Sequence, residues 1–440
     1  MHKELSGGLI LRSLSEGHES DRARLPDFYA AVNTEGESEH VQEGLRLWTR
    51  ELMEGHPTVT PDDIFVVVDP AKDDLIASAT LLIPQTWRYE EIPFVVGRPE
   101  LVGTLPDYRG RGLVRALFEA VHERSAALDH MVQSITGIPY FYRQFGYTMA
   151  IDLGEHAVFQ LSPLKDPAPE SQPAYTLRAA TAEDVPAMLH WLDHFARERL
   201  VTDLFSVEML RREIDGRNPG YFPHSMLFVI TDSGGEGVGF VALLDSLSEP
   251  WELRCPIYVV GEKASYLATF SDVVQAIKVW ATGHYGRSPE MLSFGGGIHE
   301  TLDHLIDRSH GGLIRRREYS WYLRVPEPIR FLKHIGPILE RRLAGSGAHR
   351  YTGELRIGFF TLRGISLQFE EGRLRDVAPI SGKDGYDVEF PWHLFWTVVF
   401  GHRTADEILP ILPEVWANAK AAVLLEILFP RKKSFVLGLT

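Results

Sequence analysis

One stretch of this chain, Leu101 to Tyr147, constrains the fold more than any other. Apolar residues from Leu101 to Leu105 predict a strand that ends before Pro106, and a helical pattern starts at about Leu113. The turn between them reads Arg109-Gly110-Arg111-Gly112. Because a helix start carries unpaired N–H groups and the positive end of the helix dipole, it attracts phosphate. Glycines let the backbone turn tightly and approach a ligand. The pattern predicts an acyl-coenzyme A pyrophosphate site, and the alternative is a plain turn with solvated arginines.

The order of elements around this turn narrows the choice. A strand precedes the turn, an amphipathic helix follows it, and a second strand over Met131 to Ile135 leads to a tyrosine-rich segment. This order resembles the core of the GNAT acetyltransferase superfamily, whose motif is Gln/Arg-x-x-Gly-x-Gly/Ala. Arg109 and Gly112 match the motif, and Val114 departs from it at the last position.

The tyrosine-rich segment ends in Tyr142-Arg-Gln-Phe-Gly-Tyr147. A phenol is protonated at neutral pH, so it can donate a proton to a departing thiolate. From the residues alone, Tyr140, Tyr142 and Tyr147 are all candidates for this acid, and each could instead be a packing aromatic.

The spacing Tyr-x-x-Phe-Gly-Tyr, the arginine-rich turn and the length of the chain resemble the mycobacterial "enhanced intracellular survival" acetyltransferase family. The resemblance covers the whole chain in plan and is motif-specific only within Val102 to Tyr147. It implies an acetyl-CoA-dependent N-acetyltransferase in which Tyr142 is the general acid. The terminal carboxylate, here Thr440, would be the base, acting through water. It also implies a possible homo-oligomer, and contacts to the acyl carrier from Val102, Thr104, Arg109, Gly110, Arg111, Gly112 and Leu113.

The same resemblance implies a fold of mixed α/β and α+β class in three domains. Tandem GNAT folds, with mixed twisted sheets and flanking helices, would occupy residues 1–161 and 174–325, and a sterol-carrier-like α+β domain residues 326–440. The segments Gly154 to Leu161 and Glu318 to Val325 would be the closing strands of the two GNAT domains. The proline-rich segment Ser162 to Pro173 predicts the linker between them.

The second GNAT-like domain lacks the phosphate motif. Its turn should fall within Val260 to Phe270, where no Arg-x-x-Gly occurs and Glu262 would repel phosphate. We therefore expect this domain to have lost coenzyme binding. Gly295-Gly296-Gly297 has no basic flank and is expected to be a plain turn.

Composition limits the partners and the compartment. The net charge of −15 disfavours nucleic acid and anionic membranes, and it suits a cationic acceptor such as a small-molecule or peptidyl amine. The only cysteine, Cys255, excludes an intrachain disulfide. No apolar leader and no run of ~18 apolar residues occurs, so we expect a cytoplasmic protein without a membrane span.

Other side chains suggest an acceptor site but no metal site. The segment Pro84 to Phe94 is expected to be a loop in which Trp87, Glu90 and Glu91 would bind an ammonium group by charge and cation–π contact. The alternative is an exposed loop with ordinary surface carboxylates. His18, His299 and His304 are scattered, so no metal is expected.

The sequence therefore favours an amine acetyltransferase in which the amine attacks the thioester directly. Its base would be the chain terminus or a water held by carboxylates such as Glu91. Two alternatives are a non-catalytic acyl-CoA- or lipid-binding protein and an interaction protein that senses acyl-CoA.

Overall fold

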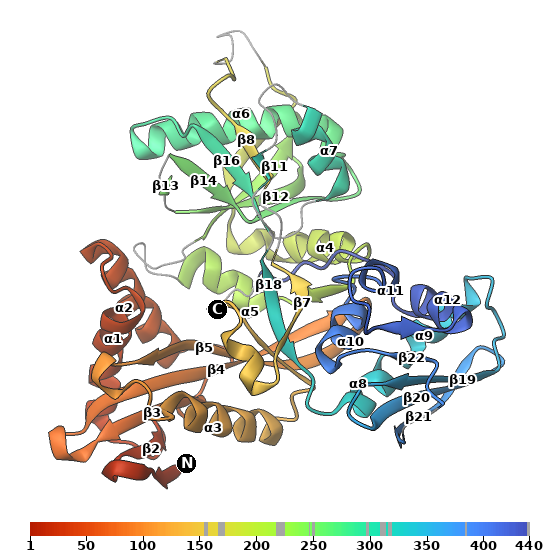
Figure 1. Ribbon diagram of the computed structural model, residues 1–440. Helices are drawn as coiled ribbons and strands as arrows, with labels where there is room; N and C mark the ends of the chain where they lie inside the picture. The colour runs from red at the N-terminus through yellow and green to blue at the C-terminus, as the bar shows by residue number, and fades with distance from the viewer. Residues whose placement is uncertain are drawn as a thin grey trace.

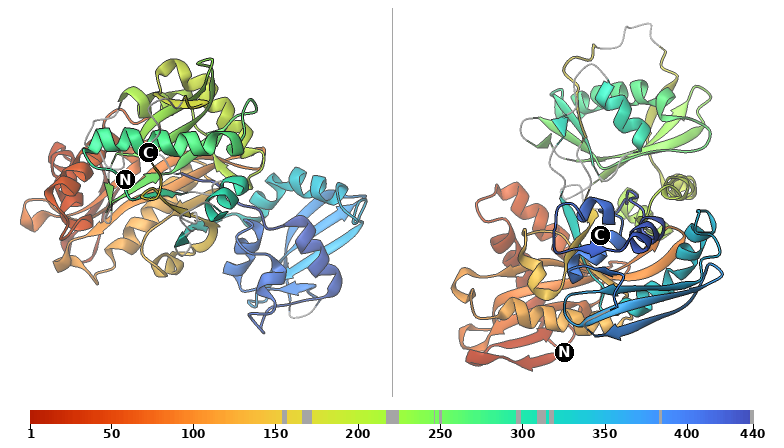
Figure 2. Two further views of the ribbon diagram at one scale, coloured as in Figure 1. Left: turned by 90° about the horizontal axis from the view of Figure 1, so that it is seen from above. Right: turned by 45° about the vertical axis from the view of Figure 1, so that its right-hand side comes forward.

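The structure is a computed structural model that describes residues 1–153, 157–165, 172–216, 225–245, 247–248, 251–295, 299–308, 314–315, 319–382 and 385–437. These residues form a mixed α/β fold of twisted mixed sheets with flanking helices, as expected from the sequence (Figure 1). Three units are visible. The second unit stands to one side of the first, and the C-terminal unit lies beside the first (Figure 2).

The first unit is built on a nine-stranded sheet in the order β1-β2-β3-β4-β5-β6-β18-β7, with β10 paired to β4. Helices α1 and α2 pack together, and α3 packs against β3, β4 and β5. The elements are β1 (His2–Glu4), β2 (Ile10–Ser13), α1 (Glu19–Asn33), α2 (Glu39–Met53), β3 (Ile64–Asp69), β4 (Leu75–Tyr89), β5 (Ile92–Thr104), α3 (Leu113–Ala127), β6 (Val132–Ile135), β7 (Thr148–Asp152), β10 (Val201–Asp203) and β18 (Ser320–Arg324).

The second unit carries a four-stranded sheet, β15-β12-β11-β9, and a five-stranded sheet, β13-β14-β16-β8-β17. Its apolar core packs under α6 and α7. The elements are β8 (Ala157–Gln160), β9 (Tyr175–Ala179), α4 (Val185–Ala196), α5 (Val207–Arg211), β11 (Ser225–Asp232), β12 (Gly237–Leu244), β13 (Leu247–Ser248), β14 (Glu252–Cys255), β15 (Ile257–Val260), α6 (Tyr266–Tyr285), β16 (Met291–Phe294), α7 (Glu300–Arg308) and β17 (Ile314–Arg315).

Two strands lie in the opposite unit from the one expected. β8 pairs with β16 and β17 of the second unit, whereas β18 lies between β6 and β7 of the first. In Figure 1, teal β18 stands beside yellow β7, and yellow β8 lies among green strands. The expectation that Gly154 to Leu161 and Glu318 to Val325 close their own domains was wrong. Both strands are buried on the two faces, so their apolar pattern fits either sheet.

The C-terminal unit is a five-stranded sheet, β21-β20-β19-β22-β23, with helices packed on it. The unit begins with two helices that meet at Ile335. The elements are α8 (Pro328–His334), α9 (Gly336–Ala344), β19 (Gly353–Gly358), β20 (Arg363–Glu370), β21 (Arg373–Ser381), β22 (Val388–Glu389), α10 (Trp392–Val399), α11 (Ala405–Ile408), β23 (Trp416–Ala417) and α12 (Ala419–Leu428). Its sterol-carrier-like character remains a prediction.

The first and C-terminal units share one hydrophobic core. Trp87 and Phe94 of the first sheet pack in the same cluster as Phe331, Trp396 and Phe400. The junction is also polar, because the Tyr89 hydroxyl donates to the Val399 carbonyl at 2.7 Å. The two units are therefore packed together as one body around the far end of β4 and β5.

Candidate functional site

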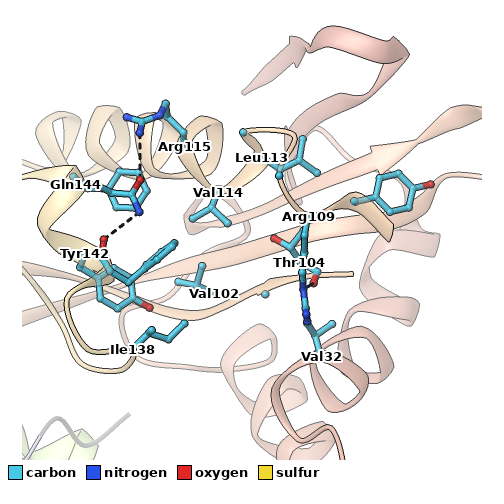
Figure 3. Close-up of a pocket in the computed structure, with 16 residues that line it drawn as sticks. Val32, Val102, Thr104, Arg109, Leu113, Val114, Arg115, Ile138, Tyr142 and Gln144 are labelled. Atoms are coloured by element: carbon cyan, nitrogen blue, oxygen red, sulfur yellow. Dashed lines mark hydrogen bonds between the residues drawn. The ribbon is translucent and has the colours of Figure 1, made fainter. Parts of the chain in front are cut away.

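A cavity of about 640 Å³ lies where β5 ends and α3 begins. Its walls are the end of β5, the turn before α3, and the segment between β6 and β7 (Figure 3). The structure brings together seven of the residues predicted from sequence in its lining, namely Val102, Thr104, Arg109, Gly110, Gly112, Leu113 and Tyr142.

The cavity exists because two neighbouring strands separate. β5 pairs with β6 only at Val96 and Gly97, and then continues to Thr104. The pairing of β5 with β4 is also irregular between Ala79 and Leu81, and Leu101 has a left-handed φ of 52°. This is the geometry of a β-bulge, which bends a strand and redirects its groups. The end of β5, from Val102 to Thr104, thereby lies along the cavity without β6 as a neighbour.

The turn before α3 presents further amides. Gly110 and Gly112 have φ angles of 75° and 77°, which L side chains rarely adopt. Gly112 is the N-cap of α3, a helix of 15 residues. The first N–H groups of a helix have no intrahelical acceptor, and together with the helix dipole they favour an anion at this end of the cavity.

The two arginines of the turn have different positions. Arg109 lines the cavity, where its Nε donates to the Thr104 carbonyl at 3.3 Å and its side chain runs past Thr104 toward Val32 (Figure 3). Arg111 stacks on the Tyr108 ring at 4.7 Å and donates to the Asp107 carbonyl. Arg111 is not part of the cavity lining, so the structure separates it from the other predicted contacts.

Arg115 is a cationic residue of the cavity that the sequence analysis missed. It lies in the first turn of α3, donates to the Gln144 Oε1 at 3.3 Å, and covers the Phe145 ring at 5.4 Å. Its position three residues after Gly112 places both on the same helix face, which is the signal that could have identified it. Arg115 thus joins the helix start to the aromatic wall.

Tyr142 is the tyrosine of the cavity. Its side chain is 4% exposed, and its hydroxyl points toward Val102 and Ile138 (Figure 3). Burial, with added effects from Glu100 and Tyr319, raises the pKa of Tyr142 well above its usual value. Within the described ranges the hydroxyl has no hydrogen-bond partner. A protonated phenol that faces the cavity can therefore donate to a bound molecule.

The other two candidate tyrosines have different surroundings. Tyr140 is 72% exposed. Tyr147 is buried and its hydroxyl lies 3.0 Å from His122 Nε2, away from the cavity lining. Of the three tyrosines, only Tyr142 lines the cavity.

The structure contradicts the acceptor loop expected over Pro84 to Phe94. β4 continues to Tyr89 and β5 starts at Ile92, so the segment consists of two paired strand ends joined by a short turn at Glu90 and Glu91. Trp87 is fully buried and packs against Phe94 and Trp321. These residues lie in the core rather than in a binding loop.

The carboxylates of Glu90 and Glu91 form ion pairs away from the cavity. Glu90 pairs with Arg342 at 2.6 Å and Lys432 at 3.3 Å, and both carboxylates pair with Arg341. Burial opposes ionisation of Glu90, but the hydrogen bond and charge of Arg342 outweigh it, so its pKa is lowered. The two carboxylates anchor the C-terminal unit and are not available to hold a water at the cavity.

Glu100 is the carboxylate that the sequence analysis overlooked. It lies on β5 two residues before Val102, and its charge contributes to the raised pKa of Tyr142. Its Oε1 accepts the Leu101 N–H at 3.2 Å, and its Oε2 pairs with Arg98. Its position on the strand just before the predicted carrier contacts was the available signal.

The corresponding turn of the second unit has a different chemistry. β15 ends at Val260 and α6 starts at Tyr266, as the sequence predicted for this turn. The Glu262 carboxylate lies 3.1 Å from His190 and from His194. A Cβ on Gly261 would lie 2.4 Å from the Trp191 ring. An acid and an indole thus occupy this turn, where the first unit has Arg109 and open space.

Several predictions lie outside the described residues. They are Thr440, the glycines Gly296 and Gly297, and part of the expected linker. The described part of the C-terminal tail ends at Leu437, whose N–H donates to the Asp203 carboxylate at 3.0 Å. Phe435 of this tail forms a parallel β-bridge with Thr202 of β10.

Two further features concern metals and membranes. Within the described ranges, no three His, Cys, Asp or Glu side chains gather closely enough to hold a metal ion. None of the described helices combines the length and the apolar character that crossing a bilayer requires.

Comparison with known proteins identifies the first unit. Residues 27–150 match the acetyltransferase (GNAT) domain family. This match contains the cavity from Val32 to Phe145, so the chain carries a GNAT acetyltransferase domain. No curated protein matches the chain in sequence.

Solved structures resemble the chain over almost its full length. A GCN5-related N-acetyltransferase from Anabaena variabilis shares 12% identity with a TM-score of 0.66, covering 97% of this chain and 99% of that one. A probable N-acyltransferase of unknown function from Enterococcus faecalis shares 11% identity, with a TM-score of 0.64 and coverage of 97% and 98%. Eis1 from Mycobacterium abscessus shares 15% identity, with a TM-score of 0.59 and coverage of 97% and 99%. At these identities the likeness concerns the fold.

Proposed function

We propose that the protein is an acetyl-CoA-dependent N-acetyltransferase that acts on a primary amine. The observation that carries this proposal is a single cavity with an anion-binding helix start at one end and the Tyr142 hydroxyl in its wall. The GNAT match of residues 27–150 supports the same chemistry, because such domains use acetyl-CoA.

Different residues along the cavity would bind different parts of acetyl-CoA. The amides of the turn at Gly110 to Gly112, with Arg109 and Arg115, would hold the pyrophosphate by charge-assisted hydrogen bonds. The free edge of β5 at Val102 and Thr104 would pair with the amide groups of the pantetheine arm. These contacts would bring the thioester to Tyr142.

Tyr142 would then act as the general acid. The amine nitrogen attacks the thioester carbonyl carbon, the carbon–sulfur bond breaks, and the phenol gives its proton to the departing sulfur. Burial keeps Tyr142 protonated at neutral pH, so its proton is available when the thiolate forms. The proton that the attacking amine releases would then neutralise the phenolate. The products are an amide and free coenzyme A.

The proton of the attacking amine needs an acceptor. Both carboxylates pair with an arginine, Glu100 with Arg98 and Glu91 with Arg341, so position decides between them. Glu100 lies on β5 close enough to affect Tyr142, whereas Glu91 lies in the turn at the far end of β4 and β5. We propose that Glu100 takes the proton through a water. The Thr440 carboxylate remains the second candidate for the base.

The acceptor is proposed to be a small-molecule or peptidyl amine of the aminoglycoside, polyamine or lysine type. The net charge of −15 would draw cations toward the protein. Ile138, Phe141 and Tyr142 would cover the apolar part of the acceptor beside the thioester.

The test compares Tyr142→Phe with Tyr140→Phe, which changes an exposed tyrosine two residues away. Both variants are incubated with acetyl-CoA and a panel of polyamines, aminoglycosides and lysine peptides, and free thiol is measured. We expect thiol release to fall about a hundredfold or more in Tyr142→Phe and to persist in Tyr140→Phe. Coenzyme A binding without thiol release in the parent protein would instead indicate a binding or sensing protein.

A further inference from the structure

The loop that carries Tyr142 spans residues 136–147, and its backbone is strained at Tyr140. Gly137, Tyr140 and Gly146 have φ angles of 124°, 68° and 86°. A left-handed conformation is unfavourable for a residue with a side chain, such as Tyr140. Such strain persists only where the surroundings enforce it.

The first half of this loop has only weak hydrogen bonds of its own. The Phe141 N–H reaches the Ile138 carbonyl at 3.4 Å, and the Arg143 N–H reaches the Tyr140 carbonyl at 3.3 Å. Both distances lie at the long end for N–H···O bonds, so these contacts hold the loop poorly. The second half is held more firmly, because the Tyr147 hydroxyl and His122 Nε2 form a hydrogen bond of 3.0 Å.

Two tyrosines from the segment of β18 hold the first half of the loop: Tyr322 lies on the strand and Tyr319 directly before it. The Tyr140 N–H donates to the Tyr322 hydroxyl at 2.8 Å, across 182 residues of sequence. The Tyr319 hydroxyl donates to the Gly137 carbonyl. The Tyr322 ring also packs against the Tyr142 ring, with centroids 6.1 Å apart. The contacts therefore reach both the backbone of the loop and the ring of Tyr142.

Gly137 connects this arrangement to the Tyr142 hydroxyl. A Cβ on Gly137 would lie 3.4 Å from the Tyr142 hydroxyl oxygen, so the two groups are neighbours. Anchoring the Gly137 carbonyl thus fixes one wall of the space in which this hydroxyl lies. Tyr322 is buried and Tyr319 is half-buried, so both hydroxyls are constrained.

We propose that Tyr322 and Tyr319 are positioning residues that hold the Tyr142 hydroxyl toward the cavity. This proposal rests on the proposed role of Tyr142 as the acid. The two tyrosines belong to the segment that follows the second unit and enters the first sheet as β18. A segment that follows the second unit in the sequence thereby supports the reactive loop of the first unit.

The test uses the full chain with 3-fluorotyrosine at position 142 and ¹⁹F NMR as the readout. Tyr322→Phe, Tyr319→Phe and the double variant remove the hydroxyls and keep the rings. We expect the ¹⁹F resonance to broaden or to move toward that of solvated fluorotyrosine, and its titration midpoint to fall. Added coenzyme A, which would occupy the cavity that this loop lines, should partly reverse the change.

Two control variants lose a comparable hydroxyl elsewhere. Tyr258→Phe removes a buried hydroxyl that donates to Thr269 at 2.9 Å, and Tyr386→Phe removes one that donates to the Gly382 carbonyl at 3.1 Å. Neither should alter the ¹⁹F resonance of position 142. A change that appears equally in these controls would assign the effect to general loss of stability and overturn the proposal.

Turnover provides the second readout. Each single variant should lower kcat by about three- to tenfold, the range expected for one lost hydrogen bond. The dissociation constant of coenzyme A should change less than about twofold, because the Arg109 to Gly112 turn lies on another element. An unchanged ¹⁹F signal and kcat in the double variant would overturn the positioning proposal. If instead Tyr142→Phe retains full turnover, the proposed function fails, while the ¹⁹F signal still decides the positioning.

Discussion

Arg109 and Thr104 are joined across the turn by a hydrogen bond of 3.3 Å from Nε to the carbonyl oxygen. The bond fixes the Arg109 guanidinium at the end of β5 and leaves its two terminal nitrogens free to meet a bound anion. Arg111, two residues later, stacks on Tyr108 instead. The two arginines thus form a natural pair of target and control.

Arg109→Ala should weaken acetyl-CoA binding about tenfold or more, because a charge-assisted hydrogen bond contributes about 1.5–3 kcal/mol. Isothermal titration calorimetry measures this directly. Arg111→Ala should change the affinity far less. The melting temperature should stay nearly constant in both variants, and equal affinities in all three proteins would remove the pyrophosphate assignment.

One buried and one half-buried histidine, His130 and His122, should make the fold sensitive to acid. Burial is the main cause that lowers the pKa of His130 from 6.5 to about 4, where Asp63 opposes and Arg124 adds to the shift. Burial, with Arg324, lowers the pKa of His122 to about 3. Below pH 6.5 the unfolded chain binds protons at these positions and the folded chain does not. Stability should therefore fall as the pH drops from about 6.5 to about 4, by up to ~1.4 kcal/mol per pH unit for each histidine.

Urea denaturation at several pH values between 4.5 and 7.5 measures this slope. His130→Asn keeps a polar group that can form a hydrogen bond with Ser125, whose hydroxyl lies 3.1 Å from the imidazole Nδ1. In this variant, the unfolding free energy should fall less steeply below pH 6.5, because one histidine no longer contributes to its pH dependence. An unchanged slope would show that His130 titrates normally in the folded protein.

The junction between the first and C-terminal units should depend on Glu90. Glu90→Gln leaves the buried Arg342, whose side chain is 10% exposed, without its carboxylate. We expect a loss of about 3 kcal/mol of unfolding free energy, as for other broken buried ion pairs. Glu91→Gln, which disrupts a largely exposed pair with Arg341, should cost less than about 1 kcal/mol. A selective rise in the KM of the amine in Glu90→Gln would restore the acceptor role that the structure argues against.

A fragment of residues 1–161 should not form a working first unit. It lacks β18, so the edges of β6 and β7 would lose the partner that joins them. Unpaired strand edges promote aggregation. Size-exclusion chromatography and coenzyme A binding should show an associated, non-binding fragment. A monomeric fragment that binds coenzyme A as well as the full chain would contradict this expectation.

The sequence predicted the site where local pattern determines it. The strand, glycine turn and helix around Arg109 follow from apolar periodicity and from the conformational freedom of glycine, and both act over a few residues. Tyr142 followed from a family resemblance rather than from chemistry, because Tyr140 and Tyr147 are equal candidates in sequence. Burial and direction distinguish the three, and only the folded chain shows them.

The predictions from sequence were wrong or incomplete where segments distant in the chain contact one another. Trp87 and Glu90 have the aromatic and acidic character of a cation site, but a shared core and Arg342, 252 residues away, account for them. The exchange of β8 and β18 was also invisible, because both strands are apolar and either sheet could accept them. Glu100 was overlooked because its place on β5, although next to the predicted carrier contacts, does not show that its charge acts on a phenol from another element.

The exchanged strand also has a consequence during synthesis. Tyr140 leaves the ribosome 182 residues before Tyr322, its partner in the folded protein. At about 5–20 residues per second, the nascent first unit waits roughly 10–40 s for its last strand. During that interval the half-built sheet is exposed to chaperones and to neighbouring chains, so acetyltransferase activity would first appear only after most of the polypeptide has been translated.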